Sequence, residues 1–415
     1  MIRDFPLRLT AVAGTLKLLL SSPASAASDP FHPKVDIERS YTSNVRYAGA
    51  TDDEDSDWST RMRLTLPLHG TWAKGTWGTT YSPSFVRYDE FTVLDDNEHR
   101  FWMQMVATPD RTTELFLSAE YIRDQVQARP ESQNPSDLFV ASRTDRQMYG
   151  LTFRSVKDFG AEWKWTSSLD GAKYNYSAIP GFDADETGGV SEDRAEYGAS
   201  VDVARIVSQS STVGLEYDFR RFELDVSESK NNHLLGATFS RTMGRDYTMR
   251  GRLGVFYRTG ETVSTSGTET SVSDSGLQGF FLLQRAFREH YLNLTASYLP
   301  SSGGALEGTS TDTALRVGLG GAPGRAWRWH AFSAFARRDS ADPELDGLRS
   351  VSGGLFLEWS LGRWIELRLE GNALDQSGSG TAELNTDYYV AGVGLVWHPA
   401  GRDPGAGKAR PGALR

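Results

Sequence analysis

The chain consists largely of short segments in which apolar and polar residues alternate, and these segments run from Lys34 to Trp397. Residues 114–121 read Glu-Leu-Phe-Leu-Ser-Ala-Glu-Tyr, and residues 365–370 read Ile-Glu-Leu-Arg-Leu-Glu. A period of two places successive side chains on opposite faces of a β-strand, whereas a helix would space the charges three and four residues apart. The pattern therefore predicts about 18 strands, each with one apolar and one polar face.

The connections between these segments alternate in length. Short connections contain the Gly, Pro and Asp residues of tight turns and lie at residues 108–111, 157–160, 243–246, 322–325 and 361–363. Long polar connections lie between them, at residues 124–142, 177–189, 260–274, 300–311, 338–347 and 375–381. Long extracellular loops and short periplasmic turns are typical of outer-membrane proteins. We predict an all-β fold, a closed antiparallel transmembrane β-barrel of about 18 strands with both termini in the periplasm.

Aromatic residues mark the ends of the predicted strands. Tryptophans lie beside the short connections, at Trp72, Trp77, Trp163, Trp165, Trp327, Trp329, Trp359, Trp364 and Trp397. Tyrosines lie beside the long connections, at Tyr47, Tyr88, Tyr174, Tyr176, Tyr257 and Tyr298. Since aromatic girdles sit at the level of the lipid headgroups, we expect a tryptophan-rich periplasmic rim and a tyrosine-rich extracellular rim.

The N-terminus has the features of an export signal. Arg3 and Arg8 precede an apolar stretch at residues 9–20, and residues 24–26 read Ala-Ser-Ala, a small-x-small cleavage site. We predict a signal peptide over residues 1–26, cleaved after Ala26 or Ala27, followed by the barrel at residues 27–397. The remaining residues 398–415 are rich in Gly, Pro and Arg and are expected to form a disordered periplasmic tail.

Composition narrows the function classes. The formal charge of −10 argues against a nucleic-acid partner, which requires a clustered basic face. The chain contains no cysteine, which excludes thiolate metal sites and cysteine nucleophiles. No mature segment reaches the roughly 18 apolar residues of a membrane-spanning helix. Acidic residues concentrate in two proposed external loops, at residues 52–57 and 95–98.

The sequence contains no recognisable catalytic or metal-binding motif. The histidines are scattered, without an HExxH pair, and no GxSxG elbow occurs. His330 is expected to face the lumen beside Arg328 as a polar wall residue. We interpret the acidic run at residues 52–57 as solvated loop charge, with divalent-cation binding as the alternative. We therefore predict no enzyme, no cofactor and no metal.

The polar faces of the predicted strands would line the lumen. Their charged residues are the candidate transport path: Arg61, Arg63, Arg100, Glu114, Glu120, Glu162, Lys164, Glu216, Asp218, Arg220, Arg250, Arg252, Arg316, Arg328, Glu366, Arg368 and Glu370. Rings of like charge set pore selectivity, but this wall is mixed, and paired charges could simply lock the strands together. Lumen aromatics such as Trp102, Phe280 and Phe332 would suit a sugar polymer moving past.

Two segments carry a family resemblance. Pro33, Ile37, residues 41–45 (Tyr-Thr-Ser-Asn-Val), an acidic loop and Asp57 follow one another in the same order as at the start of outer-membrane β-barrels associated with exopolysaccharide and capsule gene clusters, which this chain resembles. The last strand, residues 387–397, resembles the terminal signal read by the barrel assembly machinery, although the chain continues beyond it. The resemblance implies a barrel that partners a periplasmic polysaccharide export component and carries no catalytic residues.

These observations lead to one functional expectation with two alternatives. We expect a conduit in the Gram-negative outer membrane that takes part in secretion of an exopolysaccharide cargo, with outer-membrane lipids and the barrel assembly machinery as further partners. The alternative is a diffusion porin for small solutes. An outer-membrane enzyme or adhesin ranks third.

Overall fold

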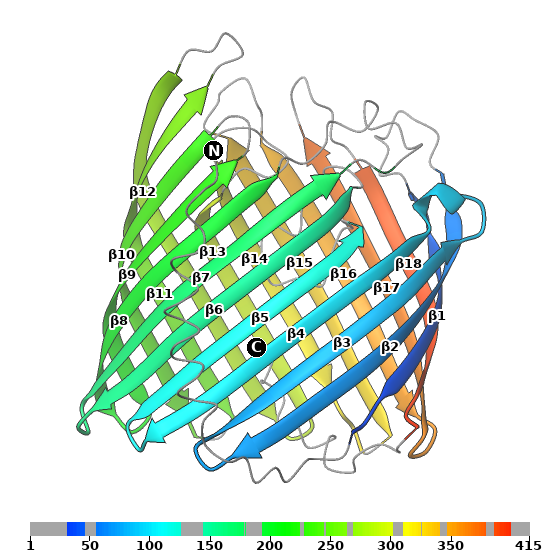
Figure 1. Ribbon diagram of the computed structural model, residues 1–415, viewed down its shortest axis with the longest axis horizontal. Coiled ribbons are helices and arrows are strands. Elements are labelled where there is room, and N and C mark those ends of the chain that lie inside the picture. Colours follow the sequence, from blue (N-terminus) through cyan, green and yellow to red (C-terminus); the bar gives the residue numbers. More distant parts are fainter. Residues whose placement is uncertain are drawn as a thin grey trace.

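The strands of the protein close into a single barrel, shown in Figure 1. The computed structural model describes residues 31–45, 55–125, 144–177, 179, 193–224, 228–244, 246–263, 269–301, 310–324, 326–340, 347–378 and 386–399. The predicted signal peptide and most of the predicted tail lie outside these residues, so both stay predictions.

Eighteen strands make up the barrel, as the alternation predicts. Their bounds are β1 (Lys34–Thr42), β2 (Asp57–Trp72), β3 (Gly75–Tyr88), β4 (Asp96–Asp110), β5 (Thr113–Gln125), β6 (Asp145–Phe159), β7 (Trp163–Ser177), β8 (Arg194–Ser208), β9 (Ser211–Leu224), β10 (Glu228–Met243), β11 (Tyr247–Val263), β12 (Glu269–Phe287), β13 (His290–Ser301), β14 (Ser310–Gly321), β15 (Trp327–Ser340), β16 (Leu348–Ser360), β17 (Ile365–Gly378) and β18 (Thr386–Trp397). Among the described residues the only helix is η1 (Thr92–Leu94). No helix in the described part of the chain is long and apolar enough to cross a membrane.

The barrel is closed by its first and last strands. Each strand pairs antiparallel with the next along the chain, and β1 pairs with both β2 and β18. The closing register runs from Val35 opposite Trp397 to Thr42 opposite Val390. Closure gives every strand a neighbour on both sides and leaves no edge strand, as the hydrocarbon region of a membrane requires.

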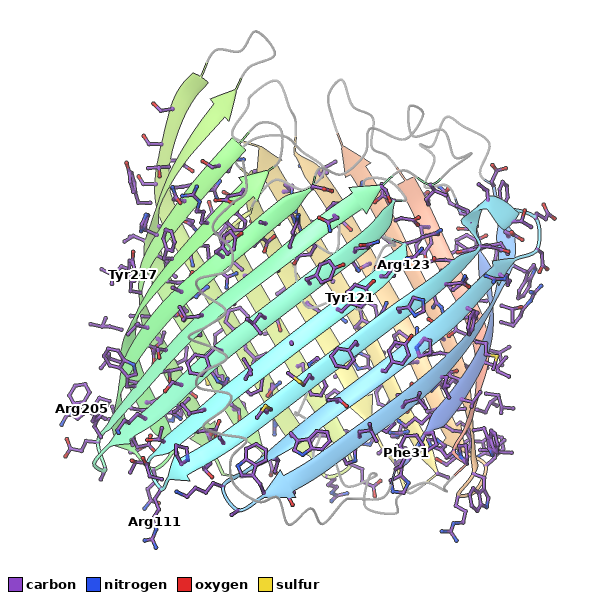
Figure 2. The ribbon with its side chains drawn as sticks, in the orientation of Figure 1. Phe31, Arg111, Tyr121, Arg123, Arg205 and Tyr217 are labelled. Carbon is purple, nitrogen blue, oxygen red and sulfur yellow. The ribbon has the colours of Figure 1, made fainter. Side chains whose placement is uncertain are left out.

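One face of each strand is apolar and points away from the barrel axis. Figure 2 shows Tyr217 of β9 projecting outward from the edge of the barrel. Leu215 on the same face is 65% exposed, and Leu253 of β11 is 66% exposed. Apolar side chains with this much exposed surface suit lipid as solvent.

The two ends of the barrel differ as the connection lengths predict. Short turns join the strands at one end, and Gly160, Gly244 and Gly324 occupy positive φ values of 67°, 62° and 77° there. These left-handed conformations favour glycine because a Cβ would crowd the backbone. Arg111 projects from another of these turns (Figure 2). All nine tryptophans expected beside short connections lie in or next to these turns, which confirms the tryptophan-rich rim: Trp72, Trp77, Trp163, Trp165, Trp327, Trp329, Trp359, Trp364 and Trp397.

The predicted long connection at residues 260–274 is wrong in extent. β11 continues to Val263 and β12 begins at Glu269, and Thr262 pairs with Thr270 across them. The Ser/Thr-rich composition suggests a flexible loop, but its β-branched residues are also good strand formers. Only residues 264–268 separate the two strands, and these lie outside the described residues.

The architecture fixes the compartment. An even number of antiparallel strands, an apolar outer face, aromatic residues at a rim, and short turns confined to one end are the features of outer-membrane barrels. The protein is therefore an integral β-barrel of the Gram-negative outer membrane.

Candidate functional site

The inner face of the barrel follows from the register of the strands. Because Tyr217 points outward, its neighbours Glu216 and Asp218 point into the barrel. Directly paired residues share a face, so Glu216 places Gly236 and Asp202 on the inner face as well. The same step, repeated around the closed barrel, assigns the described strand residues to one face, apart from the register shifts at residues 107–110 and 206–208.

All but one of the predicted lumen residues lie on this inner face: Arg61, Arg63, Arg100, Glu114, Glu120, Lys164, Glu216, Asp218, Arg220, Arg250, Arg252, Arg316, Arg328, Glu366, Arg368 and Glu370. The exception is Glu162, which belongs to the turn before β7. Its carboxylate lies 3.4 Å from Arg205, a residue that projects outward (Figure 2). The expectation that Glu162 lines the lumen is therefore wrong. The prediction extends the alternation of β7 back to residue 162, but this residue lies in the turn, where alternation does not set the direction of a side chain.

A charge network joins the strands on either side of the barrel closure. Arg368 lies 2.7 Å from Asp36 of β1, 3.2 Å from Glu358 of β16 and 3.3 Å from Glu366. Arg328 of β15 lies 2.9 Å from both Glu358 and Glu366. The sequence-based prediction misses Asp36 and Glu358 as lumen residues, although both stand at alternating positions of predicted strands.

Other ion pairs are buried at the end that carries the long connections. Glu98 accepts hydrogen bonds from Arg61 at 3.2 Å and from Ser84 at 2.7 Å. Asp124 accepts hydrogen bonds from Arg146 at 2.8 to 3.0 Å. Glu98 and Asp124 are assigned to solvated loops by sequence, and both assignments are wrong. Each residue lies near one end of a strand. A charged residue on the polar face at such a position looks, in sequence, like part of the neighbouring loop.

Asp57 also departs from its predicted role. Its carboxylate accepts hydrogen bonds from the backbone N–H groups of Trp58, Glu90 and Phe91 at 2.6, 3.0 and 3.0 Å. It is buried and anchors the β3–β4 connection. Asp57 is therefore not part of a solvated acidic run, and residues 52–54 of that run lie outside the described residues.

Three of the expected girdle tyrosines, and an apolar residue near them, point inward instead. Val45 and Tyr88 pack into a buried apolar cluster with Val86, Leu94 and Ile179, and Val86 pairs with the inward Arg61. β1 ends at Thr42, three residues before Val45, so the alternation of this strand does not set the direction of the Val45 side chain.

Tyr174 and Tyr176 also lie on the inner face, with ring centroids 6.4 Å apart. Tyr257 and Tyr298 are exposed on the outer face as expected, and Tyr47 lies outside the described residues. The tyrosine-rich rim is therefore confirmed only in part.

The inner wall between β13 and β16 carries a set of stacked rings. His330 faces the lumen as predicted, and its Nδ1 lies 3.0 Å from the hydroxyl of Tyr291. Phe332 and Phe356 stack beside His330, with centroid distances of 6.0 and 6.2 Å. The Arg316 guanidinium lies 4.2 Å from the centre of the Phe332 ring. The sequence identifies Phe332 and His330 but misses Tyr291 and Phe356.

No metal site is evident in the described part of the chain, where no group of three or more His, Cys, Asp or Glu side chains is arranged to hold an ion. The inner wall carries charged side chains and stacked aromatic rings.

Comparison with known proteins finds similar solved structures, all at low sequence identity. No protein-family model matches the sequence, and no curated protein matches it. The OccK2 (OpdF) structure of Pseudomonas aeruginosa is 11% identical, covering 89% of this chain and 98% of that one with a TM-score of 0.48. OccK1 (OpdK) of the same organism is 12% identical, covering 89% and 98% with a TM-score of 0.43. The FrpB iron transporter of Neisseria meningitidis is 10% identical, covering 86% of this chain and 64% of that one with a TM-score of 0.44.

Proposed function

We propose that this protein is a passive outer-membrane channel through which small polar solutes diffuse. The observation that carries the proposal is the exposure of charged side chains on the inner face. The side chains of Arg220 and Arg328 are 45% and 42% exposed, although both point into the barrel. Barrels of 16 to 18 strands are wide enough to hold an aqueous channel, and a charged wall keeps such a channel wet.

Conductance tests this proposal directly. We expect the purified full-length protein, reconstituted into planar bilayers, to give stepwise ion currents in potassium chloride. Since the chain has no cysteine, single cysteines can report where water reaches the wall. A water-soluble charged thiol reagent should modify Arg220→Cys and reduce the current.

The matched control is Leu215→Cys, on the same strand and the opposite face. Its thiol faces lipid, so the same reagent should leave the current unchanged. A correctly inserted protein that carries no current would overturn the proposed channel. Equal modification of both cysteines would overturn the assignment of the faces.

Export of an exopolysaccharide, with a periplasmic export component as partner, is a second candidate. It is favoured by aromatic rings that face the lumen, of which Trp102 is 38% exposed. Sugar rings stack on such surfaces through their apolar faces. We expect deletion of the gene to reduce surface polysaccharide if this candidate is correct. Unchanged polysaccharide would leave diffusion of small solutes as the function.

A further inference from the structure

Basic residues are unevenly distributed on the outer face of the barrel, at the end with the short turns. Four of them stand outward, two or three residues before the end of a strand, on the alternate strands β6, β8, β10 and β12: Lys157, Arg205, Arg241 and Arg285. All four are exposed, and Arg205 projects outward in Figure 2. On β13 to β18 and β1 to β5, no described Lys or Arg points outward within five residues of this end. We call the four residues the basic arc.

The basic arc lies at the level of the aromatic rim. Trp163 pairs directly with Arg205, whose guanidinium lies 6.0 Å from the centre of the indole ring. Tyr247 pairs directly with Arg285. Since such aromatic residues sit at the lipid headgroups, the basic groups reach the same level, with their apolar stems along the lipid-facing wall. The short turns face the periplasm, so these headgroups belong to the periplasmic leaflet.

The arc has few acidic partners within the protein. In the described part of the chain, no ion pair involves three of its members: Lys157, Arg241 and Arg285. Arg205 lies 3.4 Å from Glu162, but these side chains are 59% and 64% exposed, and so exposed a pair is worth little. Near Lys157, the Asp110 carboxylate accepts hydrogen bonds from two neighbouring threonines. The arc therefore keeps most of its positive charge available to its surroundings.

At the opposite end of the outer face, arginines are paired within the chain. Four of them lie beside carboxylates of the same protein: Arg39, Arg87, Arg221 and Arg337. Arg221 belongs to β9, between two strands of the arc, and lies 2.7 Å from Glu223. One sector of the barrel therefore carries a neutralised arginine at its extracellular end and unneutralised bases at its periplasmic end.

We propose that the basic arc binds the phosphate groups of anionic phospholipids in the periplasmic leaflet of the outer membrane. Guanidinium and ammonium groups donate charge-assisted hydrogen bonds to phosphate oxygens. A zwitterionic headgroup also carries a cation, which the arc repels, so headgroups with a net negative charge are favoured. Neighbouring strands are about 4.8 Å apart, so the arc extends about 30 Å along the rim and can hold several headgroups. This inference does not depend on what passes through the lumen.

Native mass spectrometry of the detergent-folded, full-length protein tests the inference. The probes are dioleoyl phosphatidylglycerol, which is anionic, and dioleoyl phosphatidylethanolamine, which is zwitterionic. We expect the parent chain to bind phosphatidylglycerol more tightly. Arg241→Gln and Arg285→Gln should each weaken this binding about fivefold, the factor for one basic residue near an anionic surface. The matched control Arg221→Gln, in the same sector, should bind phosphatidylglycerol as the parent does. The mobility shift on boiling in SDS confirms that each variant is folded.

Lipid contact within a membrane is measured beside the arc, at Ser211, which pairs directly with Arg241. Because the chain has no cysteine, Ser211→Cys can carry a single bimane fluorophore in mixed vesicles of the two lipids. Brominated phosphatidylglycerol should quench it more than brominated phosphatidylethanolamine, and high salt should reduce the difference.

The control fluorophore is placed at Leu68→Cys, on the outer face of β2 and away from the arc. Both brominated lipids should quench it equally. Equal quenching at Ser211→Cys as well would overturn the inference and would favour an acidic protein as the partner of the arc. Equal losses of phosphatidylglycerol binding in the Arg241 and Arg221 variants would also overturn it.

Discussion

Arg338 donates hydrogen bonds of 2.8 and 2.9 Å to the two carboxylate oxygens of Asp312, and the side chains are only 2% and 3% exposed. The pair bridges β15 and β14 on the inner face, where both charges are shielded from solvent. Residue 338 begins a long connection in the sequence-based prediction, but the structure places it inside β15.

Removing one member of this pair should destabilise the barrel. Arg338→Ala leaves the Asp312 carboxylate buried without its two donors, and such losses cost about 3–5 kcal/mol. Urea unfolding of the refolded barrel, followed by tryptophan fluorescence, measures the change. The control is Arg337→Ala on the outer face, where an exposed pair with Asp339 is worth about 0–1 kcal/mol. Equal losses would show that the buried pair has no special role.

A charge placed on the outer face should impair insertion. Leu253→Arg puts a guanidinium on the lipid side, which costs about 2–4 kcal/mol near the bilayer midplane. Gln284→Arg introduces the same residue on the inner face of the adjacent β12 and should be tolerated. Outer-membrane fractionation and the mobility shift on boiling in SDS measure both variants. Normal insertion of Leu253→Arg would contradict the assigned face.

Strand number, strand direction and the inner or outer face were predictable because a period of two leaves a strong signal in each strand. The ends of the strands were not predictable, and the errors made there share one cause. Asp124, Glu98 and Arg338 are charged residues at strand ends, and sequence cannot tell a solvated loop charge from one that an inward partner holds. Those partners become visible only once the register places distant strands side by side.

The stacked rings of the inner wall show a second limit. Phe332 and His330 alternate with outward residues of one strand, so the sequence places them in the lumen. Tyr291 and Phe356 belong to strands that are far apart in sequence, and their contact with His330 depends on cross-strand pairing. Glycine positions such as Gly320 and Gly354 provide the only local hint, because each leaves room for a neighbouring ring.

Epitope tags should report the orientation of the barrel in cells. Tags inserted at Gly160 or Gly244, in short turns, should be inaccessible to antibody on intact cells because these turns face the periplasm. Tags at Gly267 or Gly181, in connections at the opposite end, should be accessible. Permeabilised cells control for expression and folding. Reversed accessibility would invert the topology.

Charge reversal of two inward arginines of β11 should change ion selectivity without preventing insertion. Arg250→Glu combined with Arg252→Glu replaces two of the inward arginines of β11, and Arg252 normally lies 3.2 Å from Glu216. The variant wall would repel anions, so the reversal potential in a potassium chloride gradient should shift toward that of potassium. Glu114→Arg, on the inner face of β5, should shift the reversal potential toward that of chloride. The same double variant separates the two candidate functions. Reduced surface polysaccharide with intact insertion would favour export. Unchanged polysaccharide with altered selectivity would favour diffusion. An unchanged reversal potential in both variants would show that these charges do not face the permeation path.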